Sequence, residues 1–240
     1  MTADQVQAFV LAGGLGTRLR SVLPDRPKCM ADVAGRPFLE WLILGTRAQG
    51  VRRFVFCTGY RADAVEQYFR DGRKWSVEIS YSRESSPLGT GGALRLAADR
   101  SRGERMLVLN GDSYCRFDLG RLWGELERHQ AVVALWLVRK EDCSRYGTIE
   151  LGSGGEVRRF LEKQEGRRNE LINAGVYLMR SEMLDSVPHG SAASLELDIF
   201  PKIAPGSACG VPGDGPFIDI GTPESLLQAD DVIRGEFPSK

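Results

Sequence analysis

The sequence predicts an α/β protein with a Rossmann-like, doubly wound mixed sheet, for three reasons. Short apolar runs that end in Gly or Thr alternate with segments of helical periodicity. The first run leads directly into a glycine-rich turn, and ligands of such sheets lie beyond the carboxyl ends of the strands. The length of 240 residues suits one large α/β domain and is short for two, so we expect a single domain over residues 1–240.

The first half of the chain shows the alternation of strands and helices most clearly. Apolar runs predict strands at residues 7–12, 53–58, 77–81, 106–109 and 131–138. Helical spacing or helix-forming composition predicts helices at residues 37–48, 61–70, 91–98 and 119–129. The early strands are almost entirely apolar, which is typical of parallel strands that are buried on both faces.

The second half has a different pattern. Residues 147–151 and 157–161 flank a Gly-Ser-Gly-Gly turn and predict a hairpin, and further strands are predicted at 172–179 and 217–220. Residues 201–216 are dense in Gly and Pro and are predicted to be a loop. Thr222 is predicted to cap the last helix, with Pro223 in its first turn.

Composition argues against several classes of protein. The 32 basic and 32 acidic residues cancel, whereas nucleic-acid binders usually carry a basic excess. No apolar run approaches the length of a membrane span, and residues 1–5 lack the features of a signal peptide. Five cysteines without a Cys-x-x-Cys pair and only two histidines argue against zinc and against a His-based triad. We therefore expect a cytoplasmic protein with reduced thiols and no nucleic-acid or membrane partner.

The glycine-rich run at residues 11–20, Leu-Ala-Gly-Gly-Leu-Gly-Thr-Arg-Leu-Arg, predicts a phosphate-binding loop. Its glycines allow backbone amides to approach a polyanion closely. Arg18 and Lys28 can neutralise charge on a reacting phosphate. A dinucleotide fingerprint would need a third glycine where Leu19 stands, and an ATPase-type P-loop would need a Gly-Lys-Ser/Thr tripeptide, which the chain lacks.

Two aspartates are candidates for a metal site. Asp112 follows an apolar strand in Leu-Asn-Gly-Asp, and Asp219 is flanked by apolar residues on both sides. Each aspartate alone is equally compatible with a helix cap or an ion pair. Together they supply the one or two carboxylates with which proteins usually hold Mg²⁺.

The glycine run and the following Pro27-Lys28-Cys29-Met30 resemble the signature of the sugar-1-phosphate nucleotidyltransferases. That signature is Leu-Ala-Gly-Gly-x-Gly-Thr-Arg-Leu followed by Pro-Lys-x-Met, and every fixed position is present. Further matches between Gly59 and Pro223 extend the resemblance over nearly the whole chain. The resemblance implies a nucleotidyltransferase fold with a sugar-binding insertion in its second half. Residues 1–138 would then mainly bind the nucleotide, and residues 139–240 the sugar phosphate.

The resemblance also implies a reaction and its cofactor. An oxygen of a sugar 1-phosphate attacks the α-phosphorus of a nucleoside triphosphate, and pyrophosphate leaves. Because that oxygen is already ionised near pH 7, no general base is needed, and catalysis consists of positioning and charge stabilisation. Arg18 is expected to hold the pyrophosphate side, Lys28 the α-phosphate, Lys163 the acceptor phosphate, and Asp112 with Asp219 the Mg²⁺.

The remaining site residues follow from matches to the family's elements. The nucleotide is assigned to Leu11, Ala12, Gly13, Gly14, Gly16, Thr17, Gly59, Tyr60, Glu84, Pro87, Gly89, Thr90 and Gly111. The sugar phosphate is assigned to Tyr146, Gly147, Glu162, Lys163, Asn173, Ala174 and Glu196. From the sequence alone, Glu162 and Lys163 would more simply be an exposed charge pair, and Ser194 near Glu196 would be a helix cap.

The identity of the base rests on Glu84. A carboxylate that only accepts hydrogen bonds suits the adjacent N–H donors of guanine, so GTP is the expected nucleotide. Thymidylyl and adenylyl members tend to carry glutamine here, whereas some uridylyl members also carry glutamate. Uracil therefore stays an alternative to guanine.

The identity of the sugar rests on Pro87-Leu88-Gly89-Thr90-Gly91-Gly92-Ala93 and on the Ser-Leu-Glu element at residues 194–196. These elements resemble short bacterial members that make GDP-D-glycero-α-D-manno-heptose from heptose 1-phosphate for capsule or other surface polysaccharide. Alternatives are GDP-mannose, a UDP-sugar such as UDP-N-acetylmuramic acid, and a catalytically silent regulatory subunit that binds nucleotide sugars. The oligomeric state is open, with a homodimer among the options.

Overall fold

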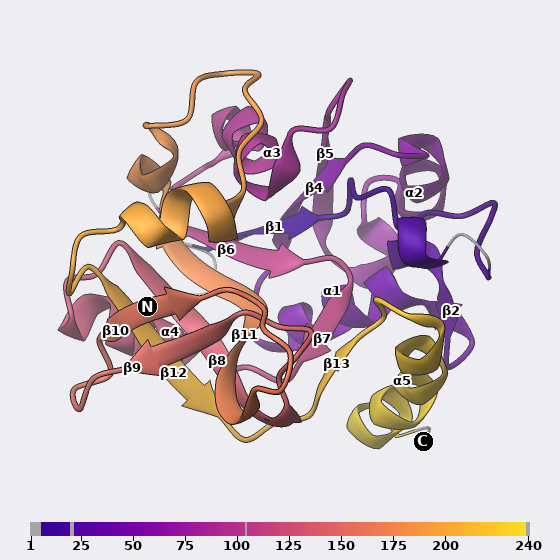
Figure 1. Cartoon of the computed structure of the whole chain (residues 1–240). Helices are drawn as coiled ribbons and strands as arrows, with labels where there is room; N and C mark the ends of the chain where they lie inside the picture. Colours follow the sequence, from indigo (N-terminus) through magenta and orange to yellow (C-terminus); the bar gives the residue numbers. More distant parts are fainter. Residues whose placement is uncertain (1–5, 20–21, 104, 239–240) are drawn as a thin grey trace.

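A computed structural model describes residues 6–19, 22–103 and 105–238. Its centre is a nine-stranded mixed sheet in which the order β10-β9-β11-β6-β1-β4-β5 forms one continuous path, and β8 joins β11 to β12 (Figure 1). The strands of this sheet are β1 (Gln7–Leu11), β4 (Arg53–Thr58), β5 (Glu78–Arg83), β6 (Arg105–Asn110), β8 (Val133–Asp142), β9 (Thr148–Leu151), β10 (Val157–Leu161), β11 (Arg168–Arg180) and β12 (Ala208–Gly213). Two small antiparallel pairs flank it: β2 (Asp32–Val33) with β3 (Arg36–Pro37), and β7 (Ser113–Cys115) with β13 (Phe217–Asp219).

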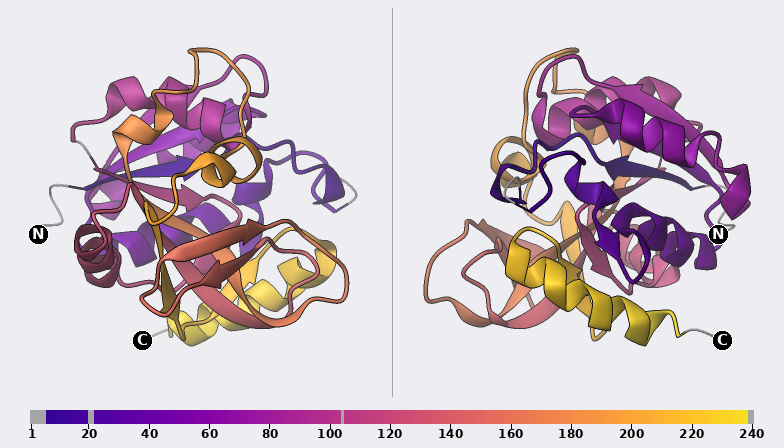
Figure 2. Two further views of the ribbon diagram at one scale, coloured as in Figure 1. Left: turned by 60° about the vertical axis from the view of Figure 1, so that its left-hand side comes forward. Right: turned by 90° about the vertical axis from the view of Figure 1, so that its right-hand side faces the viewer.

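Helices cover both faces of the sheet, which makes three layers (Figure 2). The helices are α1 (Phe38–Ala48), α2 (Ala62–Phe69), α3 (Gly89–Ala97), α4 (Leu119–Arg128) and α5 (Pro223–Glu236). Helices α1, α2, α4 and α5 contribute apolar side chains to one core cluster, whereas α3 and the short η7 helix (Leu195–Ile199) contribute to the other. The fold is therefore the mixed, doubly wound α/β class that the sequence predicts.

The apolar character of the central strands follows from this layering. Strands β6, β1, β4 and β5 are parallel to one another. In β1 the side chain of Phe9 enters one core cluster, while its neighbours Ala8 and Val10 enter the other, and all three are fully buried. Because successive side chains of a strand point to opposite faces, burial on both faces requires a continuous apolar run rather than an alternating one.

Strand β11 joins the two halves of the sheet. On one edge it pairs with β8 along most of its length, and the register of that pairing shifts between Asn173 and Tyr177. On its other edge it pairs with β9 at Ile172 and with β6 only from Val176 onward. Gly175 stands at the shift with φ +72°, a conformation that glycine adopts without strain. The irregularity therefore marks the place where the strand passes from the parallel half of the sheet to the β9–β10 hairpin.

Most predicted elements are confirmed within a few residues. The predicted hairpin forms from β9 and β10, and Thr222 accepts a hydrogen bond from the Ser225 backbone N–H as the cap of α5. Helix α2 begins one residue later than predicted because Arg61 has a left-handed backbone, with φ 49°. The prediction of a loop over residues 201–216 is wrong. Strand β12 lies within it, parallel to β8, and its Gly and Pro content is tolerated at a sheet edge.

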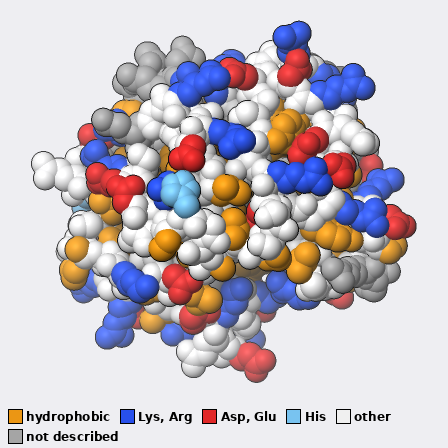
Figure 3. Space-filling model, turned by 90° about the horizontal axis from the view of Figure 1, so that it is seen from above, with side chains coloured by type: hydrophobic (Ala, Val, Ile, Leu, Met, Phe, Trp, Pro, Cys, Tyr) orange, Lys and Arg blue, Asp and Glu red, His pale blue; other side chains and the backbone are white. Residues whose placement is uncertain are grey.

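The surface agrees with the balanced charge of the sequence. On the face seen from above, basic and acidic side chains are interspersed and apolar atoms are scattered between them (Figure 3). Within the described residues, no helix is long and apolar enough to cross a membrane. All five cysteines are buried and free of disulfides. Residues 1–5, on which the expectation about a signal peptide rests, lie outside the described residues.

The irregularity in β11 leads to a stability prediction. A Cβ at Gly175 would lie 2.7–2.8 Å from the Asn110 side chain, in addition to the strain of a positive φ. We expect Gly175→Ala to lower the free energy of unfolding by about 1–3 kcal/mol, measured by urea denaturation. Gly166→Ala is the matched control, because Gly166 has φ +81° but nothing within 4 Å of its Cβ position. An equal loss in both variants would contradict a role for the close contact with Asn110.

Candidate active site

A cavity of about 380 Å³ opens at the carboxyl ends of β1 and β6. Fourteen of the residues that the sequence predicts for the site line it. They are Leu11, Ala12, Gly13, Gly14, Gly16, Thr17, Arg18, Lys28, Glu84, Pro87, Gly89, Thr90, Gly111 and Asp112. Because parallel strands end at the same edge of a sheet, segments far apart in sequence meet here.

The glycine-rich segment follows β1 and forms the floor and one wall of this cavity. After Leu11 the backbone amide of Ala12 still donates to the Cys57 carbonyl at 2.8 Å, and the chain then leaves the sheet. Gly16 has φ +57°, and a Cβ there would lie 3.2 Å from Lys28 Cβ. A single turn of 3-10 helix over Thr17–Leu19 buries Leu19 and leaves Arg18 exposed at the cavity. Glycine therefore lets the loop pass close against Lys28 while Arg18 faces open space.

Glu84 lies behind the glycine loop and is partly buried. Its Oε2 accepts a hydrogen bond from the Leu88 backbone N–H at 3.0 Å. Cβ atoms at Gly13 and Gly59 would lie 2.7 and 2.5 Å from its Oε1, so both glycines make room for this carboxylate. Burial raises the pKa of Glu84, because the charged form loses solvation. A carboxylate in this setting can still accept hydrogen bonds from a ligand in the cavity.

Lys28 and Asp112 form an ion pair at the cavity wall. Lys28 Nζ lies 2.7 Å from Asp112 Oδ2, and the Ser113 hydroxyl donates to Asp112 Oδ1 at 3.1 Å. Burial opposes ionisation of Asp112, but the charge and hydrogen bond of Lys28 outweigh it and lower the pKa of this carboxyl. The Asp112 side chain keeps 43% of its surface exposed. Its carboxylate is thus ionised and reachable from the cavity.

Asp219 lies beside this pair on β13. The Ile220 amide donates to the Asp112 carbonyl at 2.9 Å, which ties the two aspartate segments together. Arg145 Nη2 and the Gly221 amide donate to Asp219 Oδ1 at 2.6 and 2.9 Å, and the Tyr146 hydroxyl donates to Oδ2. The Asp219 carboxylate therefore has donors on both of its oxygens.

Gly221 is the point around which these groups converge. A Cβ there would lie 2.4 Å from Asp219 Oδ1, 3.0 Å from Arg145 Nη2 and 3.5 Å from Lys28 Nζ. No side chain fits in this position, so the two cations and Asp219 lie within a few ångströms of one another. Gly221 itself lines the cavity.

The donor atoms at this place suit a hard cation. Asp112 and Asp219 offer carboxylate oxygens, the ligand type that Mg²⁺ prefers, and Asp112 is exposed to the cavity. Within the described residues, no group of three or more His, Cys, Asp or Glu side chains is arranged to hold a metal. Two carboxylates are nonetheless the usual number where substrate phosphates complete the coordination.

A second cavity of about 140 Å³ lies between the β9–β10 hairpin and η7. Gly147, Glu162, Asn173 and Glu196, four of the residues predicted for the sugar, line it. Its walls also include Phe160 and Phe200, whose rings stack with centroids 5.4 Å apart. An apolar wall with a few polar groups is typical of a small-molecule site.

A hydrogen-bond network connects the two cavities. Thr90, which lines the first cavity, donates to Glu196 Oε2 at 3.0 Å, and Glu196 lines the second. The Tyr177 hydroxyl donates to Glu196 Oε1 at 3.4 Å and accepts from Asn173 Nδ2 at 2.8 Å. Ser194 also donates to Glu196 Oε2, and its own oxygen caps η7 by accepting from the Leu197 amide. Ser194 is thus both a cap and a partner of Glu196.

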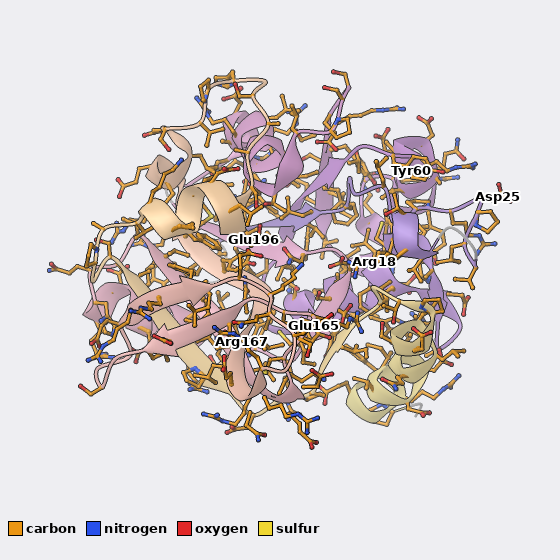
Figure 4. All side chains as sticks on the ribbon, in the orientation of Figure 1. Arg18, Asp25, Tyr60, Glu165, Arg167 and Glu196 are labelled. Carbon is orange, nitrogen blue, oxygen red and sulfur yellow. The ribbon has the colours of Figure 1, made fainter. Side chains whose placement is uncertain are left out.

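Six predicted residues line neither cavity, and Asp219, described above, is one of them. Gly59 lies against the Glu84 carboxylate. The Tyr146 hydroxyl donates a hydrogen bond to Asp219 and does not line the second cavity. Ala174 is buried, and the Lys163 side chain is exposed. Figure 4 shows Tyr60 at the upper right of the view, between Arg18 and Asp25, whereas Arg18 and Glu196 lie nearer the middle with Glu165 and Arg167 below them.

Three residues that matter here are not among the site residues assigned from the sequence. Arg145 and Gly221 surround Asp219, and Tyr177 is a fully buried member of the network. The signal for Arg145 was its place next to Tyr146-Gly147, an element already singled out. Gly111 lines the first cavity and also has a role in the packing of the sheet. A Cβ there would lie 2.5 Å from the Leu11 carbonyl oxygen, so it serves the contact between β6 and β1.

Known proteins resemble this chain over almost its whole length. A mannose-1-phosphate guanylyltransferase of Mycobacterium tuberculosis is 36% identical over 243 residues, covering 100% of this chain and 68% of that protein. A D-glycero-alpha-D-manno-heptose 1-phosphate guanylyltransferase of Campylobacter jejuni is 34% identical over 219 residues, covering 91% and 96%. The crystal structure of HddC from Yersinia pseudotuberculosis complexed with GMP-PN superposes with a TM-score of 0.83, at 33% identity and covering 94% and 98%. The model of the nucleotidyl transferase family matches residues 7–235, and the chain belongs to that family.

Proposed function

We propose that this nucleotidyltransferase transfers a guanylyl group from GTP to a sugar 1-phosphate. D-glycero-α-D-manno-heptose 1-phosphate is the first candidate for the acceptor and mannose 1-phosphate the second. The observation that carries the proposal is the pair of connected cavities, one lined by the glycine loop, Arg18, Lys28 and Asp112, and the other by polar groups on an aromatic wall. Relatives named for both acceptors support the choice of guanine and leave the two sugars to be distinguished.

The first cavity would hold the nucleotide. The amides of residues 13–17 and the Arg18 guanidinium would bind the β- and γ-phosphates, and Lys28 the α-phosphate. Glu84 would accept hydrogen bonds from the guanine N–H groups, since its Oε1 lies between two glycines at the cavity. Residues 1–138 would thus supply most of the nucleotide site, and residues 139–240 most of the acceptor site.

The second cavity would hold the sugar. Glu162, Asn173 and Glu196 can hydrogen-bond its hydroxyls, and Lys163 is the acceptor cation expected from the family resemblance. A phosphate oxygen of the sugar 1-phosphate then forms a bond to the α-phosphorus. The bond from that phosphorus to the α,β-bridging oxygen breaks, and pyrophosphate leaves with the electron pair. No proton has to move, so the residues act by orientation and by charge.

Asp112 and Asp219 would hold one Mg²⁺, which supplies charge neutralisation for the phosphates when bound. Lys28 and Arg145 balance these carboxylates in the protein alone. The reaction would take place in the cytoplasm, and its product would be used for the synthesis of surface polysaccharide. A homodimer is compatible with this activity.

The substrates can be identified by pyrophosphate release. Purified protein with Mg²⁺ is offered each nucleoside triphosphate together with heptose, mannose and glucose 1-phosphates. We expect release with GTP and heptose 1-phosphate, or with GTP and mannose 1-phosphate if the second acceptor is right. Release with UTP and not with GTP would contradict the assignment of Glu84. If no substrate pair releases pyrophosphate, the proposal that the protein is an enzyme is contradicted. The alternative of a catalytically silent regulatory subunit would then be favoured.

The metal assignment predicts that Asp112→Asn and Asp219→Asn each lower kcat. The loss should exceed the roughly 10- to 100-fold that removal of an outer-sphere partner of a metal site costs. Mg²⁺ titration of the pyrophosphate release rate measures the effect, and thermal unfolding shows whether the fold survives. Asp231→Asn, on the exposed side of α5, is the control that should behave as wild type. A full rate in either site variant would refute the metal role.

The raised pKa of Glu84 predicts a pH dependence of GTP binding. The ionised form accepts from guanine, so the KM for GTP should rise as the pH falls through this pKa. Because burial raises the pKa, the rise should begin at a higher pH than for an exposed glutamate, near 4.3. Glu84→Gln should raise the KM for GTP about 10- to 100-fold and should abolish its further rise at low pH. The control Glu127→Gln, on α4, should show the same dependence of the KM for GTP on pH as wild type. If the KM of Glu84→Gln still rises at low pH, the titrating group is not Glu84.

A further inference from the structure

Arg145 lies near the boundary between the two cavities, although it lines neither of them. It precedes Tyr146 and Gly147 in the segment that leads into β9, and Gly147 lines the second cavity. Its Nη2 would lie 3.0 Å from a Cβ at Gly221, which lines the first cavity, and Lys28 Nζ would lie 3.5 Å from the same point. A phosphate that joins a sugar in one cavity to a nucleotide in the other must pass this boundary. Arg145 is therefore near the place where a phosphate that joins the two ligands would lie.

The guanidinium of Arg145 has N–H donors that make no hydrogen bond to the described residues. Among the described residues it makes one side-chain hydrogen bond, from Nη2 to Asp219. Its Nε is buried without a hydrogen-bond partner, and its side chain keeps 36% of its surface exposed. A buried donor without a partner costs free energy that a ligand can recover. Asp219 does not depend on Arg145 for its hydrogen bonds, because the Gly221 amide and the Tyr146 hydroxyl also donate to it.

None of the described residues that line the second cavity carries a positive charge. Lys163 is the acceptor cation expected from the family resemblance, but its side chain is exposed and lines neither cavity. The contact recorded for it is made by its backbone N–H, which donates to Glu162 Oε2 at 3.4 Å. Arg145 is therefore a second candidate, besides Lys163, for the cation that binds a doubly charged phosphate at this site.

We propose that Arg145 binds the phosphate of the sugar 1-phosphate and exchanges its bond to Asp219 for that phosphate when the acceptor enters. This inference rests on the proposed guanylyl transfer. Arginine suits the role because its planar fork offers two parallel N–H groups to a phosphate. The competing explanation is that Arg145 only orients Asp219, and the two can be separated by which substrate a substitution affects.

Kinetics of Arg145→Met and Arg145→Lys test the proposal. Loss of a charge-assisted hydrogen bond should raise the KM for the sugar 1-phosphate about 10- to 100-fold in Arg145→Met. Arg145→Lys keeps the charge but not the fork, so its KM should lie between wild type and Arg145→Met. The KM for GTP and the Mg²⁺ concentration for half-maximal rate should stay at wild-type values. If these two quantities change and the KM for the sugar 1-phosphate does not, Arg145 only orients Asp219 and the proposal is wrong.

Equilibrium binding gives a readout that does not need turnover. In the GDP-sugar product, the phosphate next to the sugar comes from the sugar 1-phosphate, and GMP lacks it. Arg145→Met should therefore weaken binding of GDP-mannose or GDP-heptose, whichever the wild type makes, about 10- to 100-fold by calorimetry, and leave GMP binding unchanged. Equal affinities of wild type and Arg145→Met for the GDP-sugar would overturn the proposal.

Two further variants show whether an effect is specific to Arg145. Arg159→Met removes an exposed arginine of β10 whose contact to Glu150 is 3.8 Å long, and it should match wild type in every assay. Lys163→Met tests the acceptor cation expected from the family in parallel. If Lys163→Met alone raises the KM for the sugar 1-phosphate, the acceptor phosphate belongs to Lys163 and not to Arg145. If wild type releases no pyrophosphate with any substrate pair, the proposed function fails rather than the role of Arg145.

Discussion

The arrangement of the site depends on the irregularity in β11 between Asn173 and Tyr177. One half of the strand pairs antiparallel with β6, next to the parallel strands, and the other half pairs with β9 of the β9–β10 hairpin. The change happens at Gly175, whose backbone conformation and close contact with Asn110 exclude a side chain. As a result, Asn173 reaches the second cavity while Tyr177 stays in the core. The same few residues thus position the hydrogen bonds of Asn173 and Tyr177 in the network between the two cavities.

Charge at the boundary is arranged before any ligand is present. Lys28 is paired with Asp112 and Arg145 with Asp219, so each carboxylate has a cation beside it. Gly221 allows these groups to crowd together, because any side chain there would collide with Asp219 Oδ1. Prearranged charges need little reorganisation when substrates bind, and that is the main way a protein can accelerate a reaction without proton transfer. The two ion pairs therefore hold both carboxylates and both cations in position beside the first cavity.

The sequence allowed the residues of the first cavity to be predicted better than those of the second. The glycine run, Lys28 and Glu84 lie in short segments next to strands, so local patterns locate them. Arg145 meets Asp219 across 74 positions of sequence, and no local pattern reveals such a contact. Strand β12 was missed because its Gly and Pro composition is typical of loops, whereas pairing with β8 decides its structure. For Lys163 the family match indicated a role at the site, yet the side chain lies outside both cavities.

The central claim is that two substrates meet across the boundary between the two cavities. A crystal structure with a non-hydrolysable GTP analogue and mannose 1-phosphate tests it most directly. The account predicts the triphosphate on residues 13–18, the sugar between Asn173 and Glu196, and the acceptor phosphate between Lys28 and Arg145 with an oxygen in line with the α-phosphorus. A sugar 1-phosphate bound elsewhere, with the cavity beside Glu196 still empty, would contradict it.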